Sequence, residues 1–193
     1  FSINDIIGNV ICPIFYNIYN SDIDIYLYFD CPTSLGININ YASNTEISGF
    51  QFGIEGVTLT SASGGDAATN DWSISFSATT VLGFGLSGGP IPVGSGTLLA
   101  LEFEESVEDR TLKVINVIIS DPDGSIMSNS GPGNVEIPSC NNADCNDVCG
   151  GNTVEDACGN CGGDCEEHEV EESGEPFYYV ICGDSDQNDS IPD

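Results

Sequence analysis

Basic residues are nearly absent from this sequence. Its 193 residues include 2 Lys and Arg against 31 Asp and Glu, which gives a formal net charge of −29. Nucleic-acid binding depends on cationic contacts to phosphates, so the composition excludes nucleic acid as a direct partner. The same charge opposes binding to anionic membrane surfaces. No apolar run approaches the roughly 18 residues that predict a transmembrane helix, so we expect no membrane insertion.

The residues that commonly carry out catalysis are also scarce. The only histidine, His168, lies among glutamates, where a solvated side chain is expected and a metal ligand is the alternative. Residues 85–89 match G-x-S-x-G and residues 83–88 match G-x-G-x-x-G. Both motifs need a following helix, which Pro90 and Pro92 exclude. The many acidic residues leave a glycosidase pair open, but none lies in an evident apolar pocket motif. We therefore predict no enzymatic activity.

Short apolar runs separated by Gly, Asn, Asp, Ser and Pro dominate the middle of the chain. They predict strands at 37–41, 48–54, 57–60, 72–79, 83–86, 97–104, 111–120 and 134–137. Alternation of apolar residues predicts a core that contains Phe50, Phe52, Ile54, Trp72, Ile74, Phe76, Leu99, Leu101 and Phe103. No segment has a convincing helical period. This pattern predicts an all-β fold with a β-sandwich over residues 34–139.

The N-terminal residues 1–33 carry a further apolar strand. Residues 22–30 alternate with period two, and one face consists of Ile23, Ile25, Leu27 and Phe29. We expect the sandwich to be complete without this strand, which then needs a sheet edge. It can pair with its own sandwich, or it can act as a donor strand for a neighbouring copy. Donation that does not close on itself produces a filament.

Cysteine usage indicates an oxidising compartment. The nine cysteines are Cys12, Cys31, Cys140, Cys145, Cys149, Cys158, Cys161, Cys165 and Cys182. Six of them lie within 140–165, a density that predicts disulfides and an extracellular, secreted protein. The odd count leaves one cysteine over, and the pairing is not deducible, although Cys12 and Cys31 bracket the apolar N-terminal stretch. The Cys158–Cys161 spacing also suits half of a zinc site, but the interleaved aspartates argue against zinc. Since no hydrophobic leader precedes Phe1, we expect any secretion signal to have been removed.

The cysteine-rich segment contains a repeat of period twelve. Residues 149–152 recur as residues 161–164, and Asp144 recurs as Asp156. Twelve residues cannot bury a core of their own, so disulfides or bound cations must hold them. The candidate calcium ligands are Asp144, Asp147, Asp156 and Asp164. Residues 166–175, six of which are Glu, predict a solvated linker, and a short strand is expected at 177–182.

The C-terminal tail offers a second candidate calcium site. Hard oxygen ligands alternate along it at Asp184, Asp186, Asn188, Asp189 and Asp193. A solvated acidic tail is the alternative interpretation. Asn188 also begins the only N-glycosylation sequon, and a sugar there would compete with calcium.

Several stretches resemble known families. Residues 48–54, 78–84, 91–96 and 117–121 resemble cohesin-like β-sandwich domains of secreted microbial multidomain proteins. The repeat at 144–164 looks like the Asp-rich "CGGD" modules that follow such domains. Residues 184–193 are similar to a thrombospondin type 3 calcium repeat, with Asp189 and Ser190 standing where one residue is usual. The resemblance implies secretion, a sandwich of cohesin-like or jelly-roll type, and calcium, but no particular partner.

The sequence thus predicts four segments, 1–33, 34–139, 140–165 and 166–193. We predict a structural subunit of an extracellular fibre or surface layer. Copies of the chain would be joined head-to-tail by strand donation and stabilised by disulfides and calcium. The alternative is a cohesin-like binding module of an adhesin or scaffold that recognises a protein or a glycan. Pairing of the N-terminal strand within its own sandwich favours the binding module, and pairing with a neighbour favours the filament.

Overall fold

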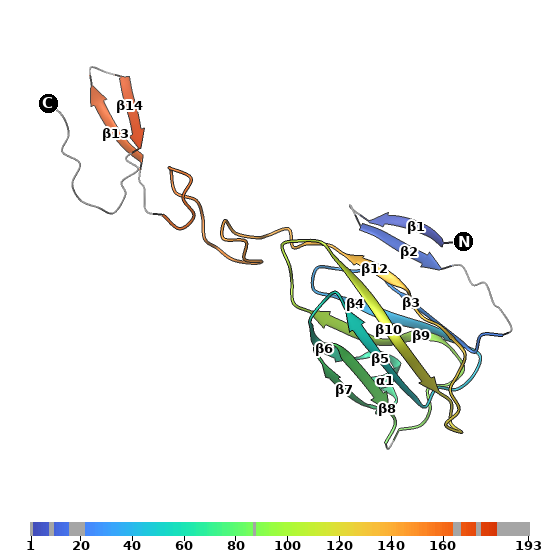
Figure 1. Cartoon of the computed structure of the whole chain (residues 1–193). Helices are drawn as coiled ribbons and strands as arrows, with labels where there is room; N and C mark the ends of the chain where they lie inside the picture. Colours follow the sequence, from blue (N-terminus) through green and yellow to red (C-terminus); the bar gives the residue numbers. More distant parts are fainter. Residues whose placement is uncertain are drawn as a thin grey trace. The chain divides into compact units, whose positions relative to one another are not determined.

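The computed structural model describes residues 2–7, 10–15, 22–86, 88–163, 167–172 and 175–180, with side chains at 22–86 and 88–163. The chain divides into two compact units, Phe1–Ser139 and Cys140–Asp193. The first unit contains a β-sandwich and the second contains the cysteine-rich repeat (Figure 1). Among the described residues the only helix is the five-residue α1 (Gly65–Thr69). This helix is too short to cross a membrane.

Two five-stranded sheets form the sandwich. In spatial order, sheet A consists of β12 (Asn134–Ile137), β10 (Arg110–Ser120), β5 (Gly49–Glu55), β8 (Thr80–Phe84) and β7 (Ser73–Ser77). Sheet B consists of β11 (Asn129–Ser130), β3 (Ile25–Phe29), β4 (Gly36–Ser43), β9 (Gly94–Phe103) and β6 (Leu59–Ser63). Neighbouring strands are antiparallel except for β11 and β3, which are parallel. The predicted all-β sandwich is confirmed.

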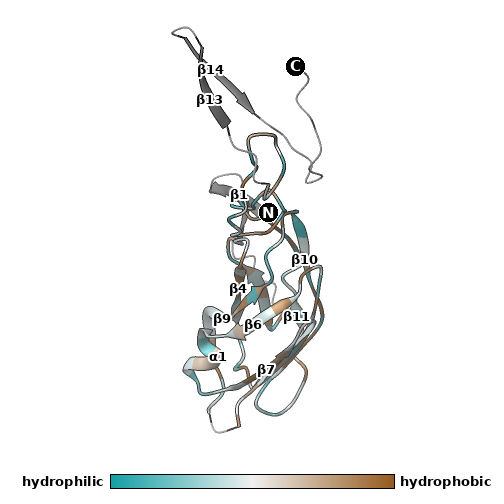
Figure 2. Cartoon of the chain, turned by 90° about the vertical axis from the view of Figure 1, so that its left-hand side faces the viewer, coloured by the Kyte–Doolittle hydropathy of each residue, from teal (hydrophilic) through white to brown (hydrophobic). Residues whose placement is uncertain are grey.

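The core lies between the sheets because apolar residues alternate along each strand. In β5, Phe50, Phe52 and Ile54 are buried, whereas Gln51 and Glu55 are exposed. Both hydrophobic and hydrophilic residues occur along the strands of the sandwich (Figure 2). Side chains of successive strand residues point to opposite faces, so this pattern places one face of each sheet inside. The largest fully buried side chains are Phe29, Phe52, Phe103, Ile25, Ile39, Ile47, Ile54, Ile91, Leu98, Leu99, Leu101 and Leu112.

The N-terminal apolar strand belongs to this core. β3 pairs with β4 along its whole length, and Ile25, Leu27 and Phe29 are buried. Ile23 precedes the strand and is half-buried. The expectation that the sandwich is complete without residues 1–33 is therefore wrong. The chain's own sheet supplies the edge, because β4 and the core between the sheets can accept the apolar face without a second copy.

Hydrogen bonds across a long sequence separation hold the start of β3. The Ser128 hydroxyl and backbone N–H both donate to Oδ2 of Asp24, at 2.7 and 2.9 Å. The Asp24 N–H also donates to the Ser128 carbonyl. These bonds, first that from the Ser128 hydroxyl, lower the pKa of Asp24. The contact fixes the parallel register in which Asn129 faces Ile25.

Two further expectations, for residues 166–175 and for Phe76, differ from the structure. The acidic segment expected to be a solvated linker instead contains β13 (Glu167–Glu172), which pairs with β14 (Glu175–Val180). The composition of residues 167–172 alone does not predict a strand. They form one because the more apolar β14 pairs with them. At the other end, β1 (Ser2–Ile7) and β2 (Val10–Phe15) form a hairpin. Phe76, expected in the core, is 44% exposed because β7 is the last strand of sheet A.

Candidate functional site

The outward side of sheet A presents a continuous surface across three adjacent strands. Strand pairing places its members in three rows, which we call the outer face: Thr80, Gly53 and Ile115; Leu82, Gln51 and Ile118; and Phe84, Gly49 and Ser120. Residues paired directly across antiparallel strands share one face of the sheet. The surface therefore combines apolar side chains with hydroxyl, amide and glycine positions.

No residue of the outer face is charged. It is drawn from three stretches without Asp, Glu, Lys, Arg or His, namely 47–54, 72–101 and 114–120. Beyond the row of Thr80, Gly53 and Ile115, the charged residues Glu55 and Lys113 are paired in register. The chain has 31 acidic residues, but none of them lies on the outer face. A partner can therefore cover this surface without removing a charge from water. Burying an uncompensated charge is costly, and the centres of protein interfaces are depleted in charged residues.

Glycine residues on the central strand, β5, leave a recess in this surface. A hollow of about 300 Å³ is lined by Gly49, Gln51, Leu82, Phe84 and Ile118, among other residues. Leu82 is 38% exposed and Ile118 is 44% exposed, so both walls of the hollow are apolar.

The other end of the surface is filled. A Cβ atom at Gly53 would lie 2.9 Å from Cγ1 of Ile115, so Ile115 covers that glycine. A β-bulge between Ile115 and Ile118 accompanies this arrangement, and Asn116 within it has a positive φ of 52°. Bulges redirect side chains locally. The hollow at Gly49 therefore lies at the opposite end of the outer face from Gly53 and the bulge.

Aromatic packing under the outer face makes it rigid. The ring of Phe50 stacks on those of Phe52 and Trp72, with centroid separations of 5.6 and 5.9 Å. A Cβ atom at Gly83 would clash with the Phe50 ring, so glycine is required there. The Trp72 indole N–H donates to the Gly89 carbonyl at 2.9 Å. A preorganised surface loses little conformational entropy when a partner binds.

A partly buried titratable pair, Tyr41 and Asp66, has a structural role. The Tyr41 hydroxyl donates to Oδ2 of Asp66, which belongs to α1, at 2.8 Å. Burial, followed by the hydrogen bond to Asp66, raises the pKa of Tyr41 far above its usual value. The phenol therefore stays protonated and anchors the helix against β4.

The aspartates predicted as metal ligands in the repeat accept hydrogen bonds from backbone N–H groups of their own turns. Oδ1 of Asp144 accepts the N–H groups of Asn146 and Val148, and its Oδ2 accepts that of Thr153. These bonds, first that from Val148, lower the pKa of Asp144. Within the described residues, no three Asp, Glu, His or Cys side chains are placed to hold one metal ion. Asp147 has a positive φ of 60° and lies in the turn.

The second repeat has the same hydrogen bonds, twelve residues later. Oδ1 of Asp156 accepts the N–H groups of Cys158 and Asn160. The backbone bond from Asp144 N–H to the Val148 carbonyl recurs from Asp156 to Asn160. Each repeat also has a glycine next to its aspartate carboxylate. A Cβ atom at Gly151 would clash with the carboxylate of Asp144, and one at Gly163 would clash with that of Asp156. Asp164 and the tail ligands Asp184, Asp186, Asn188, Asp189 and Asp193 lie outside the described residues.

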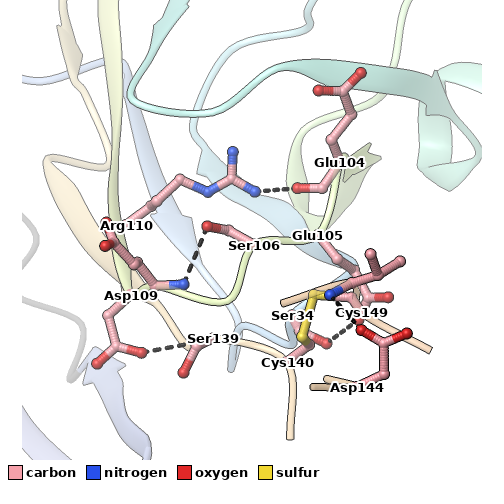
Figure 3. The surroundings of a disulfide bond; sticks show 12 residues. Ser34, Glu104, Glu105, Ser106, Asp109, Arg110, Ser139, Cys140, Asp144 and Cys149 are labelled. Atoms are coloured by element: carbon pink, nitrogen blue, oxygen red, sulfur yellow. Dashed lines mark hydrogen bonds between the residues drawn. A yellow bond between two sulfur atoms is a disulfide. The ribbon is translucent and has the colours of Figure 1, made fainter. Parts of the chain in front are cut away.

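Disulfides link the two repeats, as expected. Cys140 bonds Cys149 within the first repeat, and Cys145 bonds Cys161 across the two (Figure 3 shows the former beside the Asp144 carboxylate). Cys31 and Cys158 are disulfide-bonded as well, so zinc is not held by the Cys158–Cys161 pair. The side chains of Cys12, Cys165 and Cys182 lie outside the described residues.

The outer face was not among the sites predicted from the sequence. Acidic residues and cysteines are the conspicuous chemistry of this chain, and the outer face contains neither. The signal that would have found the face is the uncharged stretch of residues 72–101. Only strand pairing shows that part of this stretch lies beside residues 49–53 and 115–120.

Similarity to known proteins is limited to the fold. No family model matches the sequence, and no curated protein matches it. The structure resembles a CaDoc0917 variant–CaCohA2 complex chain (16% identity, TM-score 0.44), covering 60% of this chain and 99% of that one. A chain of the Coh-OlpC–Doc435 cohesin–dockerin complex from Clostridium thermocellum has 11% identity and a TM-score of 0.46, with coverages of 64% and 99%. The non-cellulosomal cohesin from Archaeoglobus fulgidus has 15% identity and a TM-score of 0.42, with coverages of 60% and 90%.

Proposed function

We propose that this chain is a secreted binding module that recognises a protein partner through the outer face of sheet A. The observation that carries the proposal is an uncharged, recessed and rigid face on a chain of net charge −29. The disulfides support secretion, because such bonds persist in oxidising compartments. Pairing of β3 within its own sandwich favours this function over the filament.

The residues of the outer face indicate which kind of partner would bind to it. Leu82 and Ile118 would pack against an apolar side chain that enters the hollow above Gly49, and Gln51 would supply an amide to the same site. Outside this centre the module is acidic, so a complementary partner carries basic residues around an apolar centre. Such charges speed encounter, and their effect falls with ionic strength.

The proposal is tested by placing a charge at the centre of the face. Gln51→Glu keeps the size of an exposed side chain but adds a charge that the partner would have to bury. Thr60→Glu on β6 adds the same charge at another exposed position and serves as the control. We expect proteins in the source organism's secreted fraction that bind wild type and Thr60→Glu to be lost from Gln51→Glu. Equal binding to all three would contradict the proposal.

One observation favours fibre assembly as a second function. Among the described residues, β11 pairs only with Ile25 and Tyr26, whereas β4 pairs with all of β3. The outer edge of sheet B beside Leu27 and Phe29 therefore offers backbone groups to an added strand. We propose that the N-terminal segment of a second copy occupies this edge, with calcium bound at residues 184–193 reducing repulsion between copies.

Deleting residues 1–21 tests the fibre, because it removes the donor segment and leaves β3 in place. The full chain should form filaments under negative-stain electron microscopy in millimolar calcium, and the truncated chain should not. Filaments from both chains, or from neither, would reject strand donation. Neither result affects binding through the outer face, which the truncated chain retains.

A further inference from the structure

β7 is an edge strand without the features that normally protect an edge. It ends sheet A, and only β8 pairs with it among the described residues (Figure 1). Its register with β8 is regular from Ser73 to Ser77 and contains no bulge. The sequence Ser-Ile-Ser-Phe-Ser has no charge, proline or glycine. Natural proteins usually block exposed edges with such residues or with bulges.

The backbone of β7 has groups directed away from β8. The turn between β7 and β8 has two residues, so Ser77 and Thr80 form the hydrogen-bonded pair that closes it. Hydrogen-bonded and non-hydrogen-bonded pairs alternate along an antiparallel ladder. Ile74 and Phe76 therefore point their N–H and C=O groups outward. No described backbone group bonds them there, and the Phe76 ring is 44% exposed.

Two other edges of the sheets are less suited to pairing. β12 carries Glu136, which accepts the Thr111 hydroxyl on the neighbouring strand. β6 is interrupted by a register shift between Leu59 and Ser61. Both features limit a regular ladder of added hydrogen bonds. The remaining edge, beside Leu27 and Phe29 of β3, is the one proposed above for the N-terminal segment of a second copy.

Charge indicates that a second copy can occupy the β7 edge. Two chains of net charge −29 repel each other, and they can approach closely only where neither presents acidic residues. β7 lies within residues 72–101, the longest uncharged stretch of the chain. In an antiparallel pair centred on Ser75, the acid nearest in sequence, Asp71, falls opposite Thr79 of the second copy. No carboxylate of residues 71–79 therefore faces another across the paired strands.

We propose that two copies of this chain associate through antiparallel pairing of their β7 strands, with Ser75 of each copy opposite Ser75 of the other. Ile74 of one copy then exchanges two backbone hydrogen bonds with Phe76 of the second copy, and the reverse pair forms by symmetry. The exposed Phe76 ring is covered by Ile74 of the second copy on the same face. The contact is isologous and closes at two copies. Sheet A continues from one copy into the other, so the dimer presents two outer faces.

Sedimentation equilibrium of the full chain tests the pairing. Wild type should be a reversible dimer. Ser75→Glu places two like charges directly opposite each other and should weaken association by about fivefold or more. Asn134→Glu, an equal charge at an exposed position of β12 on the opposite edge of sheet A, should leave the dimer intact. A wild-type monomer at all concentrations, or equal weakening by both variants, would overturn the proposal.

A mixing experiment tests the register itself. Ser75→Lys should weaken association on its own, as Ser75→Glu does. Because residue 75 faces its own counterpart, an equimolar mixture of the two variants should form a heterodimer more stable than either homodimer. A mixture no more associated than its components would exclude the Ser75–Ser75 register. Gln51→Glu should remain dimeric, which separates self-association from partner recognition.

Discussion

The sandwich and the repeat module are stabilised by different means although they belong to one chain. Residues 22–139 bury a continuous apolar core between two sheets. Residues 140–163 have exposed Val148 and Val154 and are held by disulfides and by carboxylates that accept backbone N–H groups. Covalent and polar constraints replace the core because a twelve-residue unit has too little apolar surface to bury. The two regions should therefore respond to different perturbations.

The largest difference is expected from a cavity in the core. Phe52 is 1% exposed, and Phe52→Ala should destabilise the sandwich by about 3–5 kcal/mol. The repeat module should be unaffected. Chemical denaturation measures the first effect, and amide exchange in residues 144–163 measures the second. Val148→Ala, at a side chain 52% exposed, is the control and should change neither region appreciably. Equal loss of protection in the module would show that the two units unfold together.

Removing one disulfide should reverse the comparison. Cys145–Cys161 closes a sequence separation of 16, and replacing both residues by serine should destabilise the module by about 3 kcal/mol. Amide exchange should then be fast throughout residues 144–163 while the sandwich keeps its melting temperature. Intact-mass analysis before and after reduction and alkylation counts the bridges in the wild-type chain. An unchanged module without this bridge would show that the carboxylate turns suffice.

Calcium should act on the tail and on neither of the regions compared. At free calcium about 100 times the dissociation constant, one site at residues 184–193 would stabilise its segment by about 2.7 kcal/mol. Calcium, but not magnesium, should slow proteolysis of the tail, because magnesium retains its water and demands octahedral geometry. Asp186→Asn with Asp193→Asn should abolish the difference. Identical proteolysis in calcium, in magnesium and with chelator would identify the tail as a solvated charge run.

The smallest effect is the pH dependence of the repeat. Hydrogen bonds from backbone N–H groups, first that of Val148, hold the pKa of Asp144 below its usual value. This carboxylate therefore stabilises the turn fully above about pH 4, and the stabilisation is lost as pH falls through the folded-state pKa. Exchange of the Val148 amide should accelerate over that range. Asp144→Asn should remove the pH dependence, whereas Asp147→Asn, in the same turn, should keep it.

Sequence patterns predicted the sandwich because burial follows a period of two along its strands. Phe50, Phe52 and Ile54 illustrate this, since their alternation alone places them inside. The same reasoning failed for Phe76, because a strand pattern does not show whether the strand is central or at an edge. Sequence reasoning also placed residues 1–33 outside the sandwich. The alternation of Ile25, Leu27 and Phe29 predicts a strand, but it does not indicate with which other strand it pairs.

The candidate site was even less accessible to sequence reasoning. Gln51, Leu82 and Ile118 are separated by 31 and 36 residues in the sequence and meet only through the ladders of β5 with β8 and β10. Aspartates of the repeat have the residue type of calcium ligands, and only the structure shows that their oxygens accept nearby N–H groups. Residue type indicates a possible chemistry but does not give the local contacts of a side chain.

By itself, the sequence determined the all-β class and the disulfide-linked repeat of period twelve, because composition and local periodicity act over short distances along the chain. Only the tertiary structure decided that β3 completes its own sheet, that three uncharged stretches form one face, and that β7 is left at an edge. Those outcomes depend on which strands pair, and pairing is set by the fit of side chains distant in sequence within a shared core.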